Sequence, residues 1–213
     1  MIADATFFGR GYGFLVFRAV ALKKNILLKK IVSETLDEYR KARYELEKQG
    51  FRILAIVLDG RPGVRNIFKD IPVQMCQFHQ AAIMKRYLTR NPKLEAGREL
   101  KEICSGLKDK DRSSIEQLLE VWLMKWHNFL RERTTDAGTK KWHYTHRRIR
   151  SAYKSLVINL PYLYTYKEHP KLNIPNTTNS LDGSFAYLKD LVGVHRGYSD
   201  TLKEKLIKEI LGF

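Results

Sequence analysis

Residues 51–60 read FRILAIVLDG, a short apolar run that ends in an aspartate and a glycine. Such a run is typical of a strand that is buried on both faces of a sheet. At the carboxyl end of a buried strand, an acidic side chain projects into the crevice where open α/β sheets bind ligands. Asp59 is therefore a candidate site residue, although DGRPG also suits an aspartate that forms a turn or caps a helix.

The residues on both sides of this run predict an α/β domain with a mixed sheet. A charged amphipathic segment precedes it and ends before Gly50, the preferred residue just past a helix. Apolar runs bounded by turn residues predict further strands. Strands are expected at residues 8–20, 24–34, 51–60 and 71–78, and helices at residues 34–49 and 64–68.

The hydrophobic period changes near residue 80, and the chain is then helical almost throughout. One helix carries a stripe that favours core packing, made of Ile115, Leu118, Leu119, Trp122, Trp126 and Phe129. A second helix is expected to stop at Pro161, after a polar loop at residues 134–141. A final helical region begins near Thr177. These changes divide the chain into residues 1–80, a helical insertion at 81–170, and C-terminal helices at 171–213.

Composition favours a polyanionic partner. Thirty-nine Lys and Arg against 23 Asp and Glu give a formal net charge of +16, which points to nucleic acid; the alternative is a solvated basic surface or a ribosome-associated chain. No apolar run approaches the roughly 20 residues of a membrane helix, and no signal peptide is evident, so a cytoplasmic location is expected. Two cysteines cannot build a disulfide framework.

Two more acids stand where a core pattern would not place them. Asp4 interrupts the opening run MIADATFF, and Asp182 falls in the first turn of a helix that Thr177 or Thr178 can cap. An acid in a first turn also benefits from the helix dipole, which is the alternative explanation. Gly183 beside it suits a close approach of another backbone or a ligand. Three carboxylates brought together prefer a bound cation, Mg²⁺ or Mn²⁺ for oxygen ligands, and two such ions can activate the attacking oxygen and stabilise the leaving oxygen of a phosphodiester.

Several motifs, taken in order, resemble the catalytic domain of bacterial insertion-sequence transposases of the DDE type, in the Mutator-like group. The motifs are ADATFF at Asp4, VLDG at Asp59, IPVQMCQFHQ with Cys76 and His79, KWHYTHRRIRSAY at 141–153, and NIPNTTNSLDGSFAYLKDLVGVHRG ending at Gly197. They cover nearly the whole chain, and their order is more specific than any single motif.

The resemblance implies a ribonuclease H-like mixed sheet with a large all-helical insertion. It implies an enzyme that cuts phosphodiester bonds at element ends and joins the 3′-OH ends to target DNA by transesterification. Asp4, Asp59 and Asp182 would be the catalytic residues and the ligands of two Mg²⁺ or Mn²⁺ ions. The implied partner is double-stranded DNA, bound by a homodimer at the bacterial nucleoid.

The Cys-x-x-His motif has three interpretations. In the family that the chain resembles, Cys76 and His79 would support the catalytic centre or the insertion. A zinc site needs about four ligands, and Cys104 is the only other cysteine. A thiol nucleophile paired with His79 is the third, although a cysteine between Met75 and Phe78 is expected to be buried.

Two features depart from the family pattern. The third acid is usually Glu, and Asp182 has a reach shorter by about 1.5 Å, where placement matters to roughly 0.5 Å. Only three residues precede Asp4, so the strand that carries it is expected to be shorter than the average of about five or six residues. A truncated, non-catalytic DNA-binding relic is therefore one alternative, and a different ribonuclease H-like nuclease that acts on RNA or hybrid duplexes is another.

The expected DNA contacts are basic residues in two places. They are Arg147, Arg148, Arg150 and Lys154 on the insertion, and Lys189, His195 and Arg196 after the third acid. Lys189 lies seven residues beyond Asp182 and hence on the same helix face. A solvated basic face is the alternative for each. Trp142 and Tyr144 can stack on an unpaired base, although core packing is the favoured interpretation for both.

Overall fold

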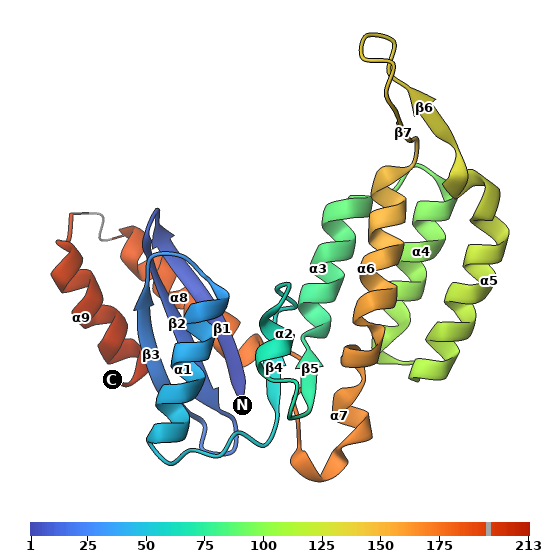
Figure 1. Cartoon of the computed structure of the whole chain (residues 1–213). Coiled ribbons are helices and arrows are strands. Elements are labelled where there is room, and N and C mark those ends of the chain that lie inside the picture. The colour runs from blue at the N-terminus through green and yellow to red at the C-terminus, as the bar shows by residue number, and fades with distance from the viewer. Residues whose placement is uncertain (195–196) are drawn as a thin grey trace. The chain divides into compact units, whose positions relative to one another are not determined.

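The computed structural model describes residues 1–194 and 197–213, which form two compact units. The sheet unit comprises residues 1–76 and 165–213, and the helical unit comprises residues 77–164 (Figure 1). The sequence placed these boundaries after residues 80 and 170. No helix in the described part of the chain is long and apolar enough to cross a membrane.

The sheet unit contains a mixed five-stranded sheet, which confirms the predicted α/β class. Its strands are β1 (Ile2–Gly9), β2 (Tyr12–Ala19), β3 (Lys24–Ile31), β4 (Ile56–Leu58) and β5 (Val73–Met75). They lie in the order β3-β2-β1-β4-β5. The first three strands are antiparallel neighbours, whereas β1, β4 and β5 are parallel to one another.

Two strands differ in length from the prediction. β1 has eight residues rather than a shortened stretch, because it continues well beyond Asp4 in antiparallel pairing with β2. β4 is only three residues long, although the apolar run begins at Phe51. The parallel neighbours of β4 limit its length, since Ile2 pairs with Val57 and β5 pairs only from Val73 onward.

One face of the sheet packs against α1 (Leu36–Lys48) and α2 (Val64–Ile67). α1 begins two residues after the predicted start at Glu34, because the Thr35 side chain accepts a hydrogen bond from the Glu38 backbone N–H and caps the helix. It ends before Gly50, which adopts a φ of 85° that favours glycine. The helix residues buried against the sheet are Tyr39, Ala42 and Leu46.

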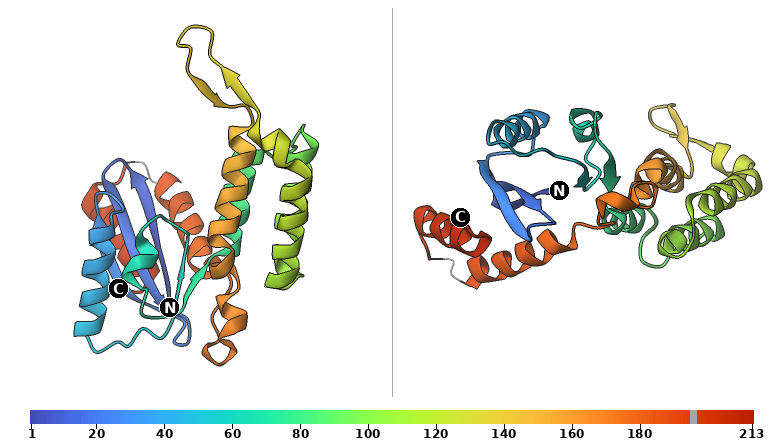
Figure 2. Two further views of the ribbon diagram at one scale, coloured as in Figure 1. Left: turned by 45° about the vertical axis from the view of Figure 1, so that its right-hand side comes forward. Right: turned by 90° about the horizontal axis from the view of Figure 1, so that it is seen from below.

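The opposite face packs against α8 (Asn179–Val194) and α9 (Asp200–Leu211), as the right-hand view of Figure 2 shows. The buried residues of these helices are Leu181, Phe185, Leu188, Ile207 and Leu211. The connection to α8 includes α7 (Thr165–Glu168) and a 3₁₀ turn at Pro170–Leu172. Asp182 lies in the first turn of α8, as predicted.

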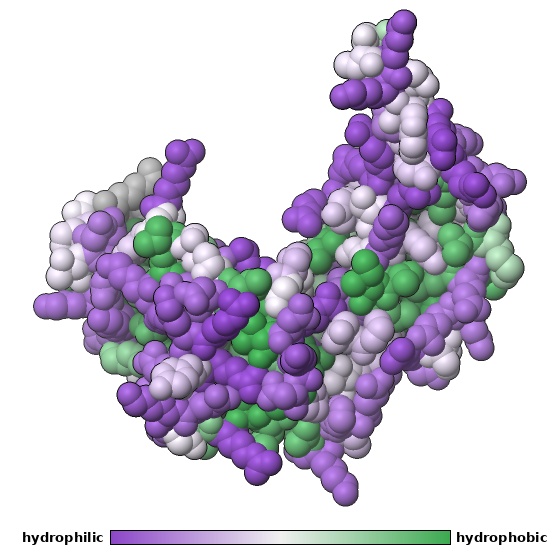
Figure 3. All heavy atoms as spheres, viewed as in Figure 1, coloured by the Kyte–Doolittle hydropathy of each residue, from purple (hydrophilic) through white to green (hydrophobic). Residues whose placement is uncertain are grey.

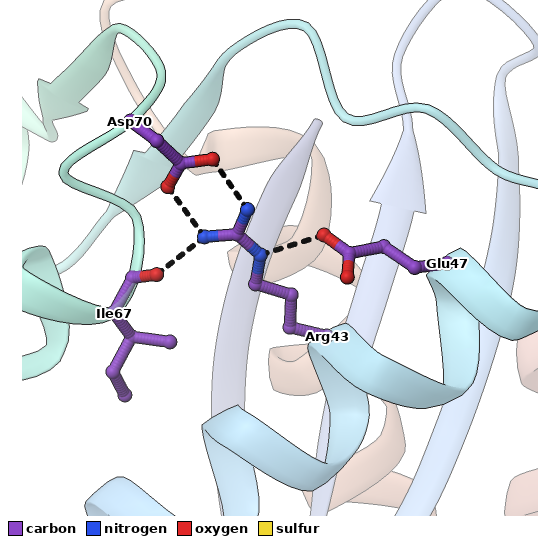
Figure 4. Close-up of polar contacts among 4 residues, drawn as sticks. All are labelled: Arg43, Glu47, Ile67 and Asp70. Atoms are coloured by element: carbon purple, nitrogen blue, oxygen red, sulfur yellow. Dashed lines mark hydrogen bonds and ion pairs between the residues drawn. The ribbon is translucent and has the colours of Figure 1, made fainter.

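Arg43 of α1 ties that helix to the segment after α2 (Figure 4). Its guanidinium donates to both Asp70 carboxylate oxygens at 2.6 and 2.5 Å, to the Ile67 carbonyl, and to Glu47 at 2.8 Å. The guanidinium also lies over the buried Phe68 ring, 5.4 Å from its centroid. The hydrogen bonds from Arg43 hold the pKa of Asp70 at about 2, below its ordinary 3.8.

Replacing Arg43 with methionine should lower the free energy of unfolding at pH 7 by about 1–2 kcal/mol, a modest loss because solvent screens the half-exposed Asp70. Because the folded-state pKa of Asp70 is depressed, its contribution is present above pH 3.8 and is lost as the pH falls through about 2. Urea unfolding across this range measures the difference. The exposed Arg40 of the same helix, changed to methionine, is the control, and an equal loss there would refute the assignment.

The helical unit contains α3 (Gln77–Leu88), α4 (Glu95–Ser105), α5 (Arg112–Arg131) and α6 (Arg147–Leu163), with a 3₁₀ turn at Gly106–Lys108. Its core contains the predicted stripe residues Ile115, Leu119 and Trp122. The Trp122 indole N–H donates to the Ala96 carbonyl at 3.1 Å, so the tryptophan also joins α5 to α4.

Two expectations for this unit were wrong. α6 continues through Pro161 to Leu163, because a proline in the last turn removes only a terminal hydrogen bond. The polar segment is a β-hairpin, in which β6 (Arg133–Thr135) pairs with β7 (Trp142–Tyr144). Asp136 stabilises the turn by accepting the backbone N–H groups of residues 138 and 139 at 3.0 and 2.7 Å.

Candidate metal centre

The first two predicted acids lie side by side on neighbouring strands. Ile2 of β1 pairs with Val57 of β4 in parallel register. Two residues further along both strands, this register places Asp4 beside Asp59, with the strands about 4.8 Å apart. The sequence therefore brings Asp59 to the carboxyl end of a buried strand, as predicted.

Asp4 is a carboxylate inside the sheet unit, only 8% exposed to solvent. Its side chain is on the same face of β1 as Ile2, which packs in the cluster with α8. The Ala5 backbone N–H donates to its Oδ1 at 2.8 Å. Burying a carboxylate is costly unless cations or hydrogen bonds compensate, so this position suits a carboxylate that holds a cation.

Asp182 of α8 converges on Asp4. Within the sheet unit, one carboxylate oxygen of Asp4 and one of Asp182 lie within 4.8 Å of each other. His79 is in the first turn of α3, three residues after Cys76. The first and third predicted acids thus meet, and the shorter side chain of Asp182 reaches Asp4 without the extra methylene of a glutamate.

Asp59 is not in this group of ligand atoms among the described residues. Its Oδ1 instead accepts the Arg61 backbone N–H at 2.9 Å. Asp59 therefore forms the local turn that was the alternative explanation for DGRPG. The register keeps the Asp59 backbone beside Asp4. The turn-forming role and a metal-binding role of Asp59 therefore differ only in the direction of its carboxylate.

Glu34, just before α1, is a neighbouring acid that sequence reasoning missed. It accepts the Tyr39 hydroxyl at 2.8 Å and an Arg61 N–H at 3.2 Å. Burial raises the pKa of Glu34 above its ordinary value, while the Tyr39 and Arg61 hydrogen bonds oppose that rise. Burial also raises the pKa of Tyr39, and Glu34, Asp59 and Asp4 raise it further. The carboxylates of Glu34, Asp59 and Asp4 are therefore all close enough to Tyr39 to affect its pKa.

Cys76 supports the third acid. The Thr178 hydroxyl lies 2.8 Å from Asp182 Oδ2 and 3.3 Å from Cys76 Sγ, and Cys76 Sγ also accepts the Thr178 backbone N–H at 3.3 Å. Both Cys76 and Thr178 are fully buried. Because the hydroxyl has one hydrogen, we assign it to the closer carboxylate, which leaves the Thr178 oxygen to accept the Cys76 thiol hydrogen. Cys76 thus fixes Thr178, which fixes Asp182.

The other interpretations of the cysteines fit less well. Neither Cys76 nor Cys104 belongs to a group of potential metal ligands within the described residues. Cys104 is buried, which raises the pKa of its thiol to about 12 and disfavours the thiolate that a metal or a nucleophile requires. Gly183 meets no other backbone, because a Cβ there would have nothing within 4 Å. Space beside Asp182 is therefore open.

The predicted DNA-contact residues have different roles. Arg148 donates to the carbonyls of Arg86 and Tyr87 at 2.6 and 2.9 Å, so it stabilises the end of α3. Arg150 donates to the Leu130 carbonyl at 2.6 Å. The remaining described candidates, Arg147, Lys154 and Lys189, are exposed. His195 and Arg196 lie outside the described residues.

Trp142 does not pack in a core, contrary to the favoured interpretation, because it is 53% exposed on β7. The Arg133 guanidinium lies 4.0 Å from the centroid of its ring. Tyr144 is partly buried, with the Arg150 guanidinium 3.6 Å from its ring centroid.

Comparison with protein families and with curated proteins found no match to this sequence.

Proposed function

We propose that this chain is the catalytic domain of a metal-dependent DNA transposase of the DDE type. The observation that carries the proposal is the convergence of Asp4 and Asp182. These residues come from opposite ends of the sequence and from different elements, β1 and α8. A strand and a helix that meet through two carboxylates form a cation site more readily than a structural contact, because like charges repel without a cation.

The topology supports a ribonuclease H-like core. The mixed sheet has the order β3-β2-β1-β4-β5, with β2 antiparallel to both of its neighbours. The helical unit is inserted between β5 and the helix that carries the third acid. This is the arrangement that the resemblance to DDE transposases implies, with the insertion between the second and third acids.

The donor set fits a divalent cation. Asp4 and Asp182 supply hard oxygen ligands, which suit Mg²⁺ and Mn²⁺, and Asp59 directly follows the adjacent strand β4. Two such ions, when bound, activate the attacking oxygen and stabilise the leaving oxygen of a phosphodiester.

The chain's own residues orient a metal ligand and supply the charge that attracts the substrate. Thr178 and Cys76 fix the orientation of Asp182, and the net charge of +16 attracts the DNA backbone. In the proposed reaction, water first cleaves the strand at the element end. The freed 3′ hydroxyl oxygen then forms a bond to a target phosphorus, while the 3′ oxygen of the target strand leaves.

A strand-transfer assay with Mn²⁺ and labelled duplex DNA ends tests the proposal. Joined products are the expected result, and Asp182→Glu should raise their yield if the shorter acid limits activity. The hydrogen bond between Asp59 and the Arg61 N–H favours one alternative, a DNA-binding relic without catalysis. DNA binding without cleavage or joining would establish that alternative, and faster cleavage of RNA–DNA hybrids would indicate a different nuclease.

A further inference from the structure

A cationic pocket of about 440 Å³ lies in the helical unit, beside the base of the β6–β7 hairpin. Four basic residues line it: His127, Arg131, Arg150 and Lys154. None of the described residues that line it is acidic. Hydrophilic and neutral residues cover most of the hairpin surface in Figure 3. The pocket therefore suits an anionic ligand.

The basic groups divide into fixed and accessible ones. Arg150 is fixed, since one guanidinium nitrogen donates to the Leu130 carbonyl at 2.6 Å while the group covers the Tyr144 ring. Arg131 and Lys154 are exposed, and one Arg131 guanidinium nitrogen lies 3.3 Å from His127 Nε2. A guanidinium and an ammonium at one pocket suit the oxygens of a phosphate group.

The pocket also has aromatic walls. Tyr144 of β7 and Tyr153 of α6 both line it. Tyr153 is held by stacking on Trp122, with ring centroids 5.3 Å apart and an angle of 20° between the planes. Positioned aromatic rings beside basic groups are the features that bind a base together with its phosphate. A simple anion site would have no need of them.

The volume of the pocket limits which ligands can enter it. A cavity of about 440 Å³ lies within the range of about 300–1,000 Å³ for pockets that hold small molecules. A base-paired duplex cannot enter a pocket of this size, because its major groove alone is about 12 Å wide and about 8.5 Å deep. One nucleotide that has left the base stack can enter, and the energy required is smallest where the strand is already unpaired.

We propose that this pocket binds a single unpaired nucleotide of a DNA strand. Arg131 and Lys154 hold its phosphate, and its base lies against the tyrosine walls. The choice of DNA rests on the proposed function. The site itself rests on the composition and size of the pocket, and it lies in the unit that supplies neither Asp4 nor Asp182.

Calorimetric titration of the full chain without metal tests the proposal, with thymidine 5′-phosphate, inorganic phosphate and thymidine as probes. The nucleotide should bind at least about tenfold more tightly than either fragment, because only it uses both the basic groups and the rings. Equal affinity for inorganic phosphate would overturn the proposal and leave an anion site. Absence of nucleotide binding would overturn it as well.

Variants of the pocket residues test which side chains bind the nucleotide. Lys154→Ala and Tyr144→Leu should each weaken nucleotide binding about tenfold. Tyr144→Phe should retain it, and Lys93→Ala, which removes an exposed charge from the same unit outside the pocket, is the matched control. An equal loss in the Lys93 variant would show that general charge, rather than the pocket, binds the nucleotide. Lys154→Gln replaces the alanine variant if circular dichroism shows that the latter is unfolded.

A second titration addresses the DNA strand. A duplex with an unpaired 3′ overhang should bind more tightly than a blunt duplex of equal charge, and Tyr144→Leu should abolish that preference. Because no metal is present, Asp4→Asn and Asp182→Asn should bind the nucleotide normally. Failure of strand transfer with intact nucleotide binding would overturn only the proposed function. Strand transfer without nucleotide binding would overturn only the pocket.

Discussion

Changing Asp4 or Asp182 to asparagine should weaken Mn²⁺ binding and reduce strand transfer, each by at least about 100-fold. Asparagine has nearly the same size and keeps one oxygen acceptor, but it removes the negative charge that attracts the cation. Asp4 is the stronger case, because it is only 8% exposed and water cannot replace the missing ligand easily. Calorimetry with Mn²⁺ and the strand-transfer assay measure the two losses separately.

Asp190→Asn is the matched control, because it removes an exposed acid from the same helix as Asp182. It should leave both measurements unchanged. Full activity in either the Asp4 or the Asp182 variant would contradict the assigned centre. Asp59→Asn separates two roles, since asparagine can still accept the Arg61 N–H. A loss as large as that at Asp4 would show that Asp59 turns toward the cation during the reaction.

The sheet unit was largely predictable because its elements are local in sequence. Apolar runs bounded by turn residues marked β2 and β3, and Gly50 marked the end of α1. β4 was overestimated because its length depends on its neighbours, which pair with it only at Ile2 and from Val73 onward. Sequence patterns give the apolar character of a strand, while its partners determine how much of it pairs.

The β6–β7 hairpin was missed for a related reason. Its strands have only three residues each, too few for an alternating pattern, and its turn depends on hydrogen bonds to Asp136. Trp142 was assigned to the core because tryptophan is usually buried. On this hairpin, the Arg133 guanidinium covers the ring instead.

The candidate site was predictable only in part. Asp4, Asp59 and Asp182 were identifiable because each acid stands within or beside an apolar run. Glu34 was not, because a glutamate just before a helix is ordinary and its importance comes from Tyr39 and Arg61. Contacts between residues distant in sequence leave no periodic pattern.

Thr178 illustrates the same limit and gives the second strong prediction. A threonine before α8 is expected to cap the helix with its hydroxyl, whereas this hydroxyl contacts the Asp182 carboxylate and Cys76 Sγ. Thr178→Val keeps the branched shape and removes the hydroxyl. Asp182 then loses the contact that orients it, and Mn²⁺ affinity should fall about 10–100-fold, the usual cost of losing a group that orients a metal ligand. Calorimetry with Mn²⁺ measures the change.

Two controls distinguish orientation of the carboxylate from a general loss of stability. Thr178→Ser retains the hydroxyl and should retain most of the Mn²⁺ affinity. Thr165→Val removes another buried hydroxyl of the sheet unit, one that donates to the Val73 carbonyl at 2.8 Å. It should lower the free energy of unfolding by about 1 kcal/mol and leave Mn²⁺ affinity unchanged. If Thr165→Val weakens Mn²⁺ binding as much as Thr178→Val, the link from Cys76 through Thr178 to Asp182 only stabilises the fold.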